Sequence, residues 1–315
     1  MDMRLITLAL GTFAIGTDSF VVAGILPEVS QSLDVSIEAA GQMITVYALA
    51  YALMTPVMAT LTAHWPRRRV LGSGLVIFTI GNVLTAIAPS FDLVLFARVL
   101  AGVGGAMFTP AASATAAALV PPESRGRALA VVMAGLSGAT ALGAPIGTLV
   151  GSVGDWRATM WLVVVLGVLA GLGIAMALPQ LPGSTRLPLR ERLAPLGDPR
   201  VAMTLITTLF VLAGLYTVYS YVSVVFERAT GGDGSILAGL IAIWGIAATV
   251  GNLVAGGLTD RLGSRLVINL AIVVAGIDFA LMPVLSTTFL GSVVALVVWG
   301  LCGWGMLVPQ QHRLI

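Results

Sequence analysis

Residues 256–265 read Gly-Gly-Leu-Thr-Asp-Arg-Leu-Gly-Ser-Arg, a short polar stretch between two long apolar runs. A related stretch, Leu-Thr-Ala-His-Trp-Pro-Arg-Arg, occupies residues 61–68, so the shared Leu-Thr pairs begin 197 residues apart, at positions 61 and 258. The same offset carries the apolar run 5–26 onto the run 200–225. Six apolar runs separate the two copies, and this spacing predicts a helical chain built from two similar halves.

The composition excludes a water-soluble protein. Of the 315 residues, 58% are hydrophobic and 10% are charged, and the mean hydropathy is +1.01, whereas soluble proteins carry about 25% charged residues. A chain of this length cannot bury so much apolar surface in its own core, so the excess must face lipid. The run 5–26 is too long for the core of a signal peptide and has no cleavage site with small residues.

Several chemistries are excluded by the residue types that the sequence lacks. All 16 basic residues are Arg, so the lysines of P-loop NTPases, protein kinases and Schiff-base enzymes have no counterpart. His64, His312 and Cys302 are too few for a His/Cys metal centre or a disulfide. The Arg residues lie in short clusters between apolar runs, which does not indicate nucleic-acid binding. We therefore expect no enzymatic activity, no cofactor, no metal and no nucleic-acid partner.

Apolar runs bounded by charged residues, Pro and Gly predict an all-α multi-pass membrane protein with about ten spanning helices of ~20 residues or more. They cover residues 5–26, 38–63, 70–88, 93–118, 127–150, 158–178, 200–225, 235–258, 266–285 and 289–309. Residues 179–199 hold five prolines among charged residues and predict a linker. The expected organisation is a six-helix half over 1–178, the linker 179–199, and a partial second half of four helices over 200–315.

The Arg residues also predict the orientation, because cytoplasmic loops carry an excess of positive charge. Thirteen of the 16 lie in the N-terminal segment or in the connections that would share its side, and only Arg157 and Arg228 lie in the others. Arg98 lies within a predicted helix. We therefore expect the N-terminus and the linker to be cytoplasmic, in the inner or plasma membrane of the cell.

Five motifs follow one another along the chain. They are Leu10-Gly11 through Asp18 to Leu26-Pro27, then Arg98 through Ala106, Arg125-Gly126-Arg127, Gly143-Ala-Pro145-Ile-Gly147, and the loop 256–265. Together they resemble the major facilitator superfamily, in its drug–proton antiporter branch, near the arabinose-efflux-like and chloramphenicol-resistance-like permeases of bacteria. The first copy of the loop departs from the family pattern, because Ala63 and Pro66 stand where Asp and Gly are usual.

This resemblance implies the major facilitator fold and secondary transport, in which two halves rock about a site near the middle of the membrane. The function it implies is export of a small organic compound (a drug, sugar or nucleoside) in exchange for protons. Proton-coupled uptake or uniport shares the fold, and a non-transporting remnant or sensor is the alternative outside transport. The expected partners are the small-molecule substrate, protons and the lipid bilayer, and a complete version of the chain is expected to be monomeric.

Asp18, Arg98 and Asp278 are the ionisable residues deep within predicted helices. Each costs at least ~2.5 kcal/mol near a bilayer centre, so each needs a partner or a water-filled cavity. The depths of Asp18 and Arg98 differ by only ~5 Å at the helical rise, so the two can pair. We expect Asp18 to carry the coupling proton and Arg98 to tune it, with a static ion pair as the alternative. Asp278 is on a helix that the resemblance places at the periphery, where a structural hydrogen bond is expected.

Small and polar side chains that share helix faces predict a central cavity. The candidate lining residues are Gly11, Ala14, Gly102, Gly105, Thr109, Tyr216, Tyr219, Ser220 and Ser223. The resemblance implies that the first, fourth and seventh helices line this cavity, and the rings of Tyr216 or Tyr219 suit an amphipathic organic substrate. Anchoring of these rings at the outer membrane interface is the alternative, and it is preferred for Tyr221.

In the fifth helix, Ala139, Gly143, Gly147 and Gly151 recur every four residues and predict close packing against another helix. Pro145, within the same segment, predicts a bend. A contact between two halves that move against each other is the functional interpretation of this ridge, and it requires the close packing.

The loop 256–265 predicts a cytoplasmic latch. Asp260 can accept hydrogen bonds from Arg261, Arg265 or the start of a neighbouring helix. The other candidate latch residues are Gly263 in the same loop and Arg67 and Arg68 in the first copy. The two latches should be unequal, since the first copy lacks the carboxylate, and its Arg residues then serve as topology determinants or bind anionic lipid. A solvated run of charges is the alternative.

The 197-residue offset also predicts counterparts of the fifth and sixth helices near positions 324–347 and 355–375, beyond Ile315. We therefore expect a truncated or frame-interrupted transporter, poorly stable alone unless a second chain completes the half. Transport by the purified 315-residue chain, beside a version extended by two helices, would test this expectation.

Overall fold

The computed structural model describes residues 2–183 and 188–305, and this part of the chain is helical without strands. The helices are α1 (Met3–Val21), α2 (Leu26–Leu33), α3 (Ile37–Leu61), α4 (Arg67–Ile87), α5 (Phe91–Ala118), α6 (Arg125–Gly138), α7 (Ala144–Val153), α8 (Trp156–Ala177), α9 (Leu189–Leu193), α10 (Pro199–Ser220), α11 (Val222–Val225), α12 (Glu227–Thr230), α13 (Gly234–Leu262), α14 (Ser264–Leu285) and α15 (Phe289–Gly305). Within these residues, nine helical stretches are long and apolar enough to span a membrane, and Phe289–Trp304 is a shorter apolar helix. The predicted fold class, an all-α multi-pass membrane protein, is confirmed.

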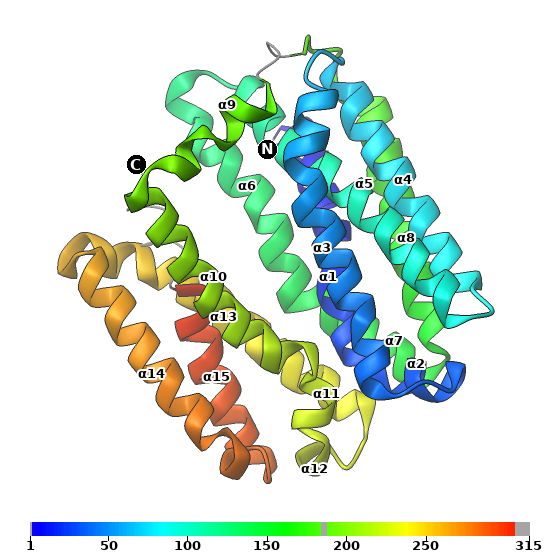
Figure 1. Ribbon diagram of the computed structural model, residues 1–315, viewed down its shortest axis with the longest axis vertical. Coiled ribbons are helices and arrows are strands. Elements are labelled where there is room, and N and C mark those ends of the chain that lie inside the picture. Colours follow the sequence, from blue (N-terminus) through cyan, green and yellow to red (C-terminus); the bar gives the residue numbers. More distant parts are fainter. Residues whose placement is uncertain (1, 184–187, 306–315) are drawn as a thin grey trace.

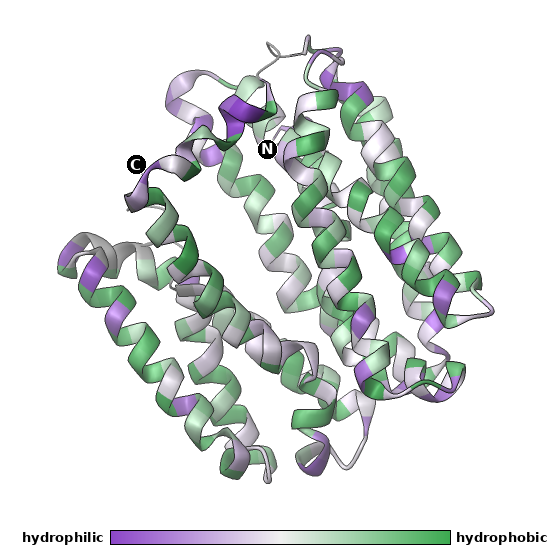
Figure 2. Ribbon diagram, viewed as in Figure 1, coloured by the Kyte–Doolittle hydropathy of each residue, from purple (hydrophilic) through white to green (hydrophobic). Residues whose placement is uncertain are grey.

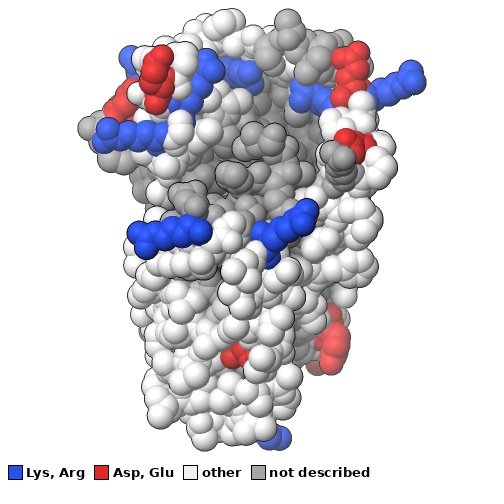
Figure 3. All heavy atoms as spheres, turned by 90° about the vertical axis from the view of Figure 1, so that its left-hand side faces the viewer, with Lys and Arg blue, Asp and Glu red and all other residues white. Residues whose placement is uncertain are grey.

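The helices form two groups, a first group of α1 to α8 and a second group of α10 to α15. The two groups lie close together at one end and diverge toward the end that carries α9 (Figure 1). Apolar residues cover most of the helix lengths, while hydrophilic residues concentrate near the helix ends and in the connections (Figure 2). On the face shown in Figure 3, Arg side chains gather mainly toward the α9 end, above a broad surface that carries only isolated charged side chains. This distribution is the one expected of helices that cross an apolar layer.

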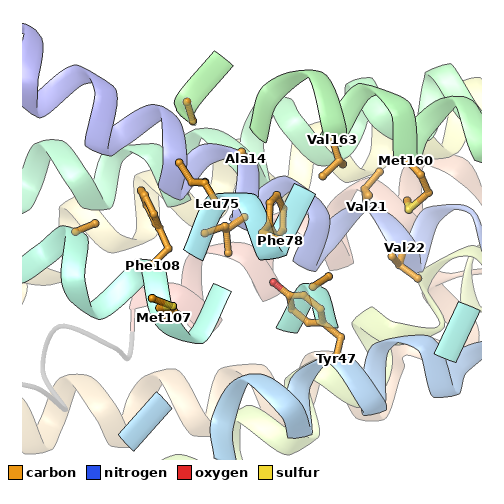
Figure 4. Packing of buried hydrophobic residues seen from close by; sticks show 14 of the residues in the cluster. Ala14, Val21, Val22, Tyr47, Leu75, Phe78, Met107, Phe108, Met160 and Val163 are labelled. Carbon is orange, nitrogen blue, oxygen red and sulfur yellow. The ribbon is translucent and has the colours of Figure 1, made fainter. Parts of the chain in front are cut away.

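Two hydrophobic clusters hold the helices together. The larger one is built from α1 to α8, and Figure 4 shows Leu75, Phe78 and Phe108 packed in its interior. The smaller one is built mainly from α10 to α15, and it also includes Phe20 and Ala144 from the first group of helices. The two groups are therefore joined by apolar contacts at the end where they lie close together.

Local signals in the sequence account for several helix ends. Ser36 begins α3, where its Oγ accepts a hydrogen bond from the Ala39 N–H at 3.2 Å. Asp155 caps α8 in the same way through the Arg157 N–H at 3.0 Å. Gly263 joins α13 to α14 with a φ of +80°, a conformation that a side chain would strain. This tight turn explains the glycine in the loop 256–265.

Two of the predicted helices are interrupted. The run predicted over 5–26 divides into α1, a 3-10 turn and the separate short helix α2, with Pro27 in the first turn of α2. The run predicted over 200–225 ends at Ser220, because the backbone leaves the helical region at Tyr221 (φ −116°, ψ 29°) before α11 begins. Both breaks lie at the end of the molecule where the two groups of helices meet.

The expected bend in the fifth span takes the form of a π-helical turn. Residues 139–143 form this turn between α6 and α7, and Pro145 follows it in the first turn of α7. A proline has no N–H to donate and its ring crowds the carbonyl four residues earlier, which here belongs to Ala141. A wider π turn at that position accommodates both effects, so α6 and α7 together form one bent span.

The ridge of small residues in this span packs against α1, within the first group of helices. A Cβ atom at Gly143 would collide with Thr17, and one at Gly147 would collide with Val21. The interpretation of this ridge as the moving contact between the two halves is therefore wrong for Gly143 and Gly147. The ridge allows α1 to approach α6–α7 closely, and the neighbouring face of the span meets the second group.

Candidate functional site

A buried ion pair joins α1 to α5. Asp18 Oδ1 accepts a hydrogen bond from Arg98 Nη1 at 2.6 Å, and the two side chains are 0% and 1% exposed. Arg98 Nε also donates to the Met43 carbonyl at 3.5 Å, and the guanidinium carbon lies 4.4 Å from the centre of the Tyr47 ring on α3. The amide group of Asn82, from α4, lies beside the Asp18 carboxylate. Four helices therefore converge on this pair.

Two hydroxyl groups separate the ion pair from a cavity. Ser19, which follows Asp18 in the chain, lies with its Oγ 3.1 Å from the Tyr47 hydroxyl, and both residues line the cavity. Tyr47 thus contacts Arg98 with its ring, and its hydroxyl group lies beside Ser19, which also lines the cavity. A change at Asp18 or Arg98 has a direct route to the cavity wall through these two residues.

The cavity has a volume of about 620 Å³, within the range of small-molecule sites. It extends along α10 from Ser220 to Leu205, toward the α9 end of the molecule. Its lining residues are Thr12, Ile15, Gly16, Ser19, Phe20, Ile44, Tyr47, Ala48, Tyr51, Thr109, Met133, Leu136, Leu205, Thr208, Leu209, Leu212, Ala213, Tyr216, Tyr219, Ser220 and Trp304. The lining therefore comes from both groups of helices.

Some of the residues expected to line the cavity do so in the structure. They are Thr109, Tyr216, Tyr219 and Ser220. Tyr216 is 40% exposed because it faces this open space, whereas Tyr219 is 4% exposed. The stripe on α10 predicted from helical spacing therefore points to the cavity over most of its length.

The small residues of α1 and α5 pack against helices and do not line the cavity. A Cβ atom at Gly11 would collide with the Phe108 ring, and Ala14 is fully buried in the larger cluster. Gly102 lies against the backbone of α3, and Gly105 lies against the Tyr51 ring. Small side chains leave room for close helix contact as readily as for a ligand, and here helix contact takes that room. The cavity assignment of these four residues is wrong.

Ser223 is also absent from the cavity wall. It lies in α11, is 6% exposed, and its Oγ has no hydrogen-bond partner among the described residues. The break in the backbone at Tyr221 rotates it away from the stripe that Tyr216 and Tyr219 continue. The assignment failed because it assumed one continuous helix over 200–225.

An aromatic cluster lies beside the cavity, around a second space of about 210 Å³. Tyr219 and Trp244 have ring centres 4.6 Å apart, and Trp244 and Trp299 are 5.4 Å apart. Phe20, from α1, lies edge-on to Tyr219 at 5.6 Å and stacks on Tyr216 at 6.2 Å. Trp244 and Trp299 were not singled out from the sequence, although both lie well inside their helices, away from the ends where interfacial Trp is usual.

The cavity is closed at the end opposite α9. The Tyr219 hydroxyl donates a hydrogen bond to the Phe20 carbonyl at 3.0 Å, which ties α10 to α1. The Tyr221 hydroxyl reaches α3 at Gly41, where a Cβ atom would have no room. Tyr221 is therefore a contact between the two groups of helices, and its interpretation as a membrane-interface anchor stays a prediction.

Glycines in α13 extend the same closed contact. Gly245 fits against the backbone of Thr140 and Ala141 in the π turn, and Gly234 fits against Ser152 at the end of α7. A side chain at either glycine would force the two groups apart. The closed end therefore depends on close backbone approach, with the bent span on one side and α13 on the other.

The loop 61–68 contacts its own half of the molecule and the linker. Arg68 donates a hydrogen bond to the Ala175 carbonyl near the end of α8, and the Arg67 N–H donates to the Leu181 carbonyl at 3.0 Å. Ala63 is 4% exposed, and its carbonyl lies against Gly183 of the linker. A carboxylate at position 63 would be buried there, which gives a physical reason for the alanine.

The second latch loop is described only in part. Arg261, Gly263 and Arg265 are exposed at the junction of α13 and α14, and the side chain of Asp260 lies outside the described residues. The latch formed by this loop stays a prediction.

Asp278, on α14, is 5% exposed, and it lines neither the cavity nor the aromatic space. Its Oδ2 atom has no hydrogen-bond partner within the described part of the chain, so the expected structural bond is not made through that oxygen. Residues 2–183 and 188–305 contain no group of three or more His, Cys, Asp or Glu side chains that could hold a metal ion.

A ligand-sized cavity between two groups of membrane-spanning helices, closed at one end, is the architecture of a secondary transporter. The sequence matches the family described as the Major Facilitator Superfamily over residues 8–315. The chain therefore belongs to the major facilitator superfamily, and its fold is the one that the motifs predicted.

Individual relatives agree with this assignment. The chain is 32% identical over 315 residues to the inner membrane transport protein YdhP of Escherichia coli K12, covering all of this chain and 81% of that protein. It is 30% identical to the uncharacterized MFS-type transporter YbcL of Bacillus subtilis, covering 99% of this chain and 80% of that protein. It is 34% identical over 266 residues to a chloramphenicol resistance protein of Streptomyces lividans, covering 83% and 68%.

Solved structures share the fold at lower identity. A bacterial homologue of the human lysosomal transporter Spinster, in an inward-facing and unoccupied conformation, aligns with a TM-score of 0.76 at 20% identity, over 98% of this chain and 74% of that one. A mutant of the nucleoside transporter NupG aligns with a TM-score of 0.74 at 14% identity, over 98% and 81%.

Proposed function

We propose that this protein exports a small organic compound from the cytoplasm in exchange for protons, with its N-terminus on the cytoplasmic side. The observation that carries the proposal is the buried Asp18–Arg98 pair, one layer of hydroxyl groups away from a ligand-sized cavity. The similarity to a chloramphenicol resistance protein supports export and the drug–proton antiporter branch. The accumulation of Arg toward the α9 end supports the orientation.

Proton binding at Asp18 is the step that would couple the two flows. A proton on the carboxyl group removes its charge, so the Asp18 carboxyl no longer attracts Arg98 electrostatically. Removing one partner of a buried ion pair costs about 3–5 kcal/mol, because the other charge stays buried without compensation. A cost of this size is enough to shift a two-state equilibrium between inward-open and outward-open forms.

Tyr47 offers a physical link between this step and the substrate. Its ring packs on the Arg98 guanidinium, and its hydroxyl group lies at the cavity wall beside Ser19. A substrate in the cavity would contact Tyr47 and Ser19, and a proton on Asp18 would act on the same two residues through Arg98. Binding of the one would therefore oppose binding of the other. Such competition is what exchange, rather than uptake of both species together, requires.

The test uses the purified 315-residue chain in proteoliposomes. Asp18→Asn should abolish transport driven by a pH gradient and retain exchange of substrate across the membrane at equal pH. Asp278→Asn is the matched control, because that carboxylate is also buried in a span but lies away from the cavity. If Asp18→Asn pumps at the wild-type rate under a pH gradient, Asp18 is not the proton carrier.

The direction of transport is tested separately in vesicles of opposite orientation prepared from one strain. Export by exchange predicts substrate accumulation in inside-out vesicles that are acidified inside, and none in right-side-out vesicles with an acidic exterior, because an exchanger accumulates its substrate on the acidic side of the membrane. Accumulation in right-side-out vesicles with an acidic exterior would indicate proton-coupled uptake instead.

A further inference from the structure

The lining of the cavity carries no charge among the residues that the structure describes. Its polar side-chain groups are the hydroxyls of Ser, Thr and Tyr and the indole N–H groups of Trp, and the rest of the wall is apolar or aromatic. Asp18 is fully buried behind Ser19, and its charge is balanced by Arg98 at 2.6 Å. A substrate in the cavity therefore meets a surface that is close to electrically neutral.

Because the described wall of the cavity carries no charge, substrates differ in how much hydration free energy they lose on entering it. An ion that leaves water for such a cavity gives up its hydration without gaining an opposite charge. Aromatic rings do attract cations, but that attraction recovers only part of the lost hydration free energy. The attraction is strongest where the faces of several rings surround an open centre. Here Tyr219, Trp244 and Trp299 pack against one another, with ring centres 4.6 and 5.4 Å apart, so they do not form a cage of ring faces around an open centre.

The aromatic cluster favours a flat ligand with hydrogen-bonding groups. Rings and planar amides stack on or lie edge-on to such side chains at separations of 4.5 to 7 Å. Trp244 lines the smaller space, and its indole N–H is buried without a hydrogen-bond partner within the described residues. A buried donor without a partner is costly, and an acceptor oxygen on a bound ligand would satisfy it. The hydroxyls of the larger cavity can serve further polar groups of the same ligand.

We propose that this cavity selects an uncharged aromatic compound with acceptor oxygens, and that its exchange for a proton moves net charge across the membrane. The proposal rests on the proposed function for the exchange itself. Asp18 is the one carboxylate beside the cavity in the part of the chain that the structure describes, so one proton enters for each molecule that leaves. One positive charge then moves inward in each cycle, whereas exchange of a monovalent cation for a proton would move none.

Equilibrium binding tests the substrate class without transport. The protein in lipid nanodiscs, with empty nanodiscs as the blank, is titrated with three radiolabelled probes: chloramphenicol (uncharged), tetraphenylphosphonium (a cation) and benzoate (an anion). We expect chloramphenicol to bind at least tenfold more tightly than either ion. Equal or tighter binding of an ion, or binding of none of the three, overturns the substrate class.

A pair of Trp variants tests the location. Trp244→Leu should weaken chloramphenicol binding about tenfold, the loss expected for a stacking contact together with a hydrogen bond. Trp161→Leu, on α8, should leave binding unchanged, because Trp161 is 45% exposed and lines neither space. Equal effects of the two substitutions would show that the aromatic cluster is not the binding site.

A membrane potential tests the charge balance. Proteoliposomes loaded with chloramphenicol, at equal pH on both sides, are given a potassium diffusion potential with valinomycin. We expect efflux to accelerate when the potential drives protons inward and to slow when its sign is reversed. Efflux that responds to a pH gradient but not to the potential overturns the charge movement and leaves proton exchange standing. A response to neither force refutes the proposed function, while the binding result still decides the substrate class.

Discussion

Tyr47 joins the buried ion pair to the cavity by two different contacts. The ring lies 4.4 Å from the Arg98 guanidinium carbon, and the hydroxyl group lies 3.1 Å from Ser19 Oγ. The two contacts can be separated experimentally, because phenylalanine keeps the ring and removes only the hydroxyl group. Coupling that passes through the hydroxyl pair would then be lost without loss of the ion pair.

We expect Tyr47→Phe to cost about 1 kcal/mol or less in stability, the usual net value of one hydrogen bond. The exchange rate should depend less on pH, since protonation of Asp18 can no longer affect the cavity wall through the contact between Tyr47 and Ser19. Substrate exchange at several pH values in proteoliposomes measures this effect. Tyr51→Phe, which also removes a hydroxyl group from the cavity wall, is the control and should keep the wild-type pH profile.

The ion pair itself predicts a strongly non-additive result. Arg98→Met leaves Asp18 buried without its partner, and we expect it to lower the free energy of unfolding by about 3–5 kcal/mol. The double substitution Asp18→Leu and Arg98→Met removes both charges, and it should recover most of that stability without restoring proton coupling. Thermal unfolding in detergent, followed by circular dichroism, measures all three forms. A double variant no more stable than Arg98→Met would show that Arg98 is held mainly by Met43 and Tyr47.

At the scale of the element, the span formed by α6, the π turn and α7 has two faces that each pack against another helix. One face carries Gly143 and Gly147 against α1, and the other presents the backbone at Thr140 and Ala141 to Gly245 of α13. The bend before Pro145 lets a single span serve both contacts. Packing within one half and contact between the halves are therefore separate properties of this element.

Two glycine substitutions distinguish close packing from simple helix propensity. Gly143→Ala should destabilise the protein, because its Cβ atom would collide with Thr17 in the core of the first group. Gly171→Ala, on α8, has open space and should stabilise the protein by about 0.5–1 kcal/mol through helix propensity alone. The midpoints of thermal unfolding of the two variants should shift in opposite directions, and a shift in the same direction would contradict this account.

At the scale of the whole molecule, the described contacts between the two groups of helices concentrate toward the closed end. Phe20 with Tyr219, Gly41 with Tyr221, and Gly245 with the π turn make the contact, and the cavity extends from there toward α9. Opening the other side of the cavity requires these contacts to separate. The closed end is therefore the place where a covalent bridge would stop the cycle.

A disulfide between α7 and α13 tests this expectation. Ser152 lies against Gly234, so Ser152→Cys and Gly234→Cys should form a bridge after small backbone shifts. The background should carry Cys302→Ser, because Cys302 is the only natural cysteine. Oxidation should abolish transport and reduction should restore it. Full transport by the oxidised, bridged protein would show that the closed end need not open.

The orientation is tested by labelling single cysteines in intact cells. Gln31→Cys lies on the exposed surface of α2, and Arg190→Cys lies on the exposed surface of α9 in the linker. A membrane-impermeant maleimide should label position 31 from outside and should label position 190 only after the cells are opened. The reverse pattern would place the N-terminus outside.

Much of the fold could be predicted because hydropathy and motif order are properties of the chain itself. The membrane class follows from 58% hydrophobic residues, and the family follows from motifs such as the loop 256–265. The closeness of Asp18 and Arg98 could also be anticipated, because helical rise converts sequence position into depth in the membrane. Helix breaks were less accessible: α10 ends at Ser220 within an apolar run that continues to Val225.

The sequence by itself determined that the chain spans a membrane, which superfamily it belongs to, and which ionisable residues must be buried. Only the tertiary structure decided what each small or aromatic residue faces. Gly11 and Gly102 have the spacing of a cavity stripe but pack against other helices, while Trp244 and Trp299 form the aromatic cluster beside the cavity. The physical reason is that helical periodicity defines a face, whereas the rotation and neighbours of the helix decide whether that face meets lipid, protein or open space.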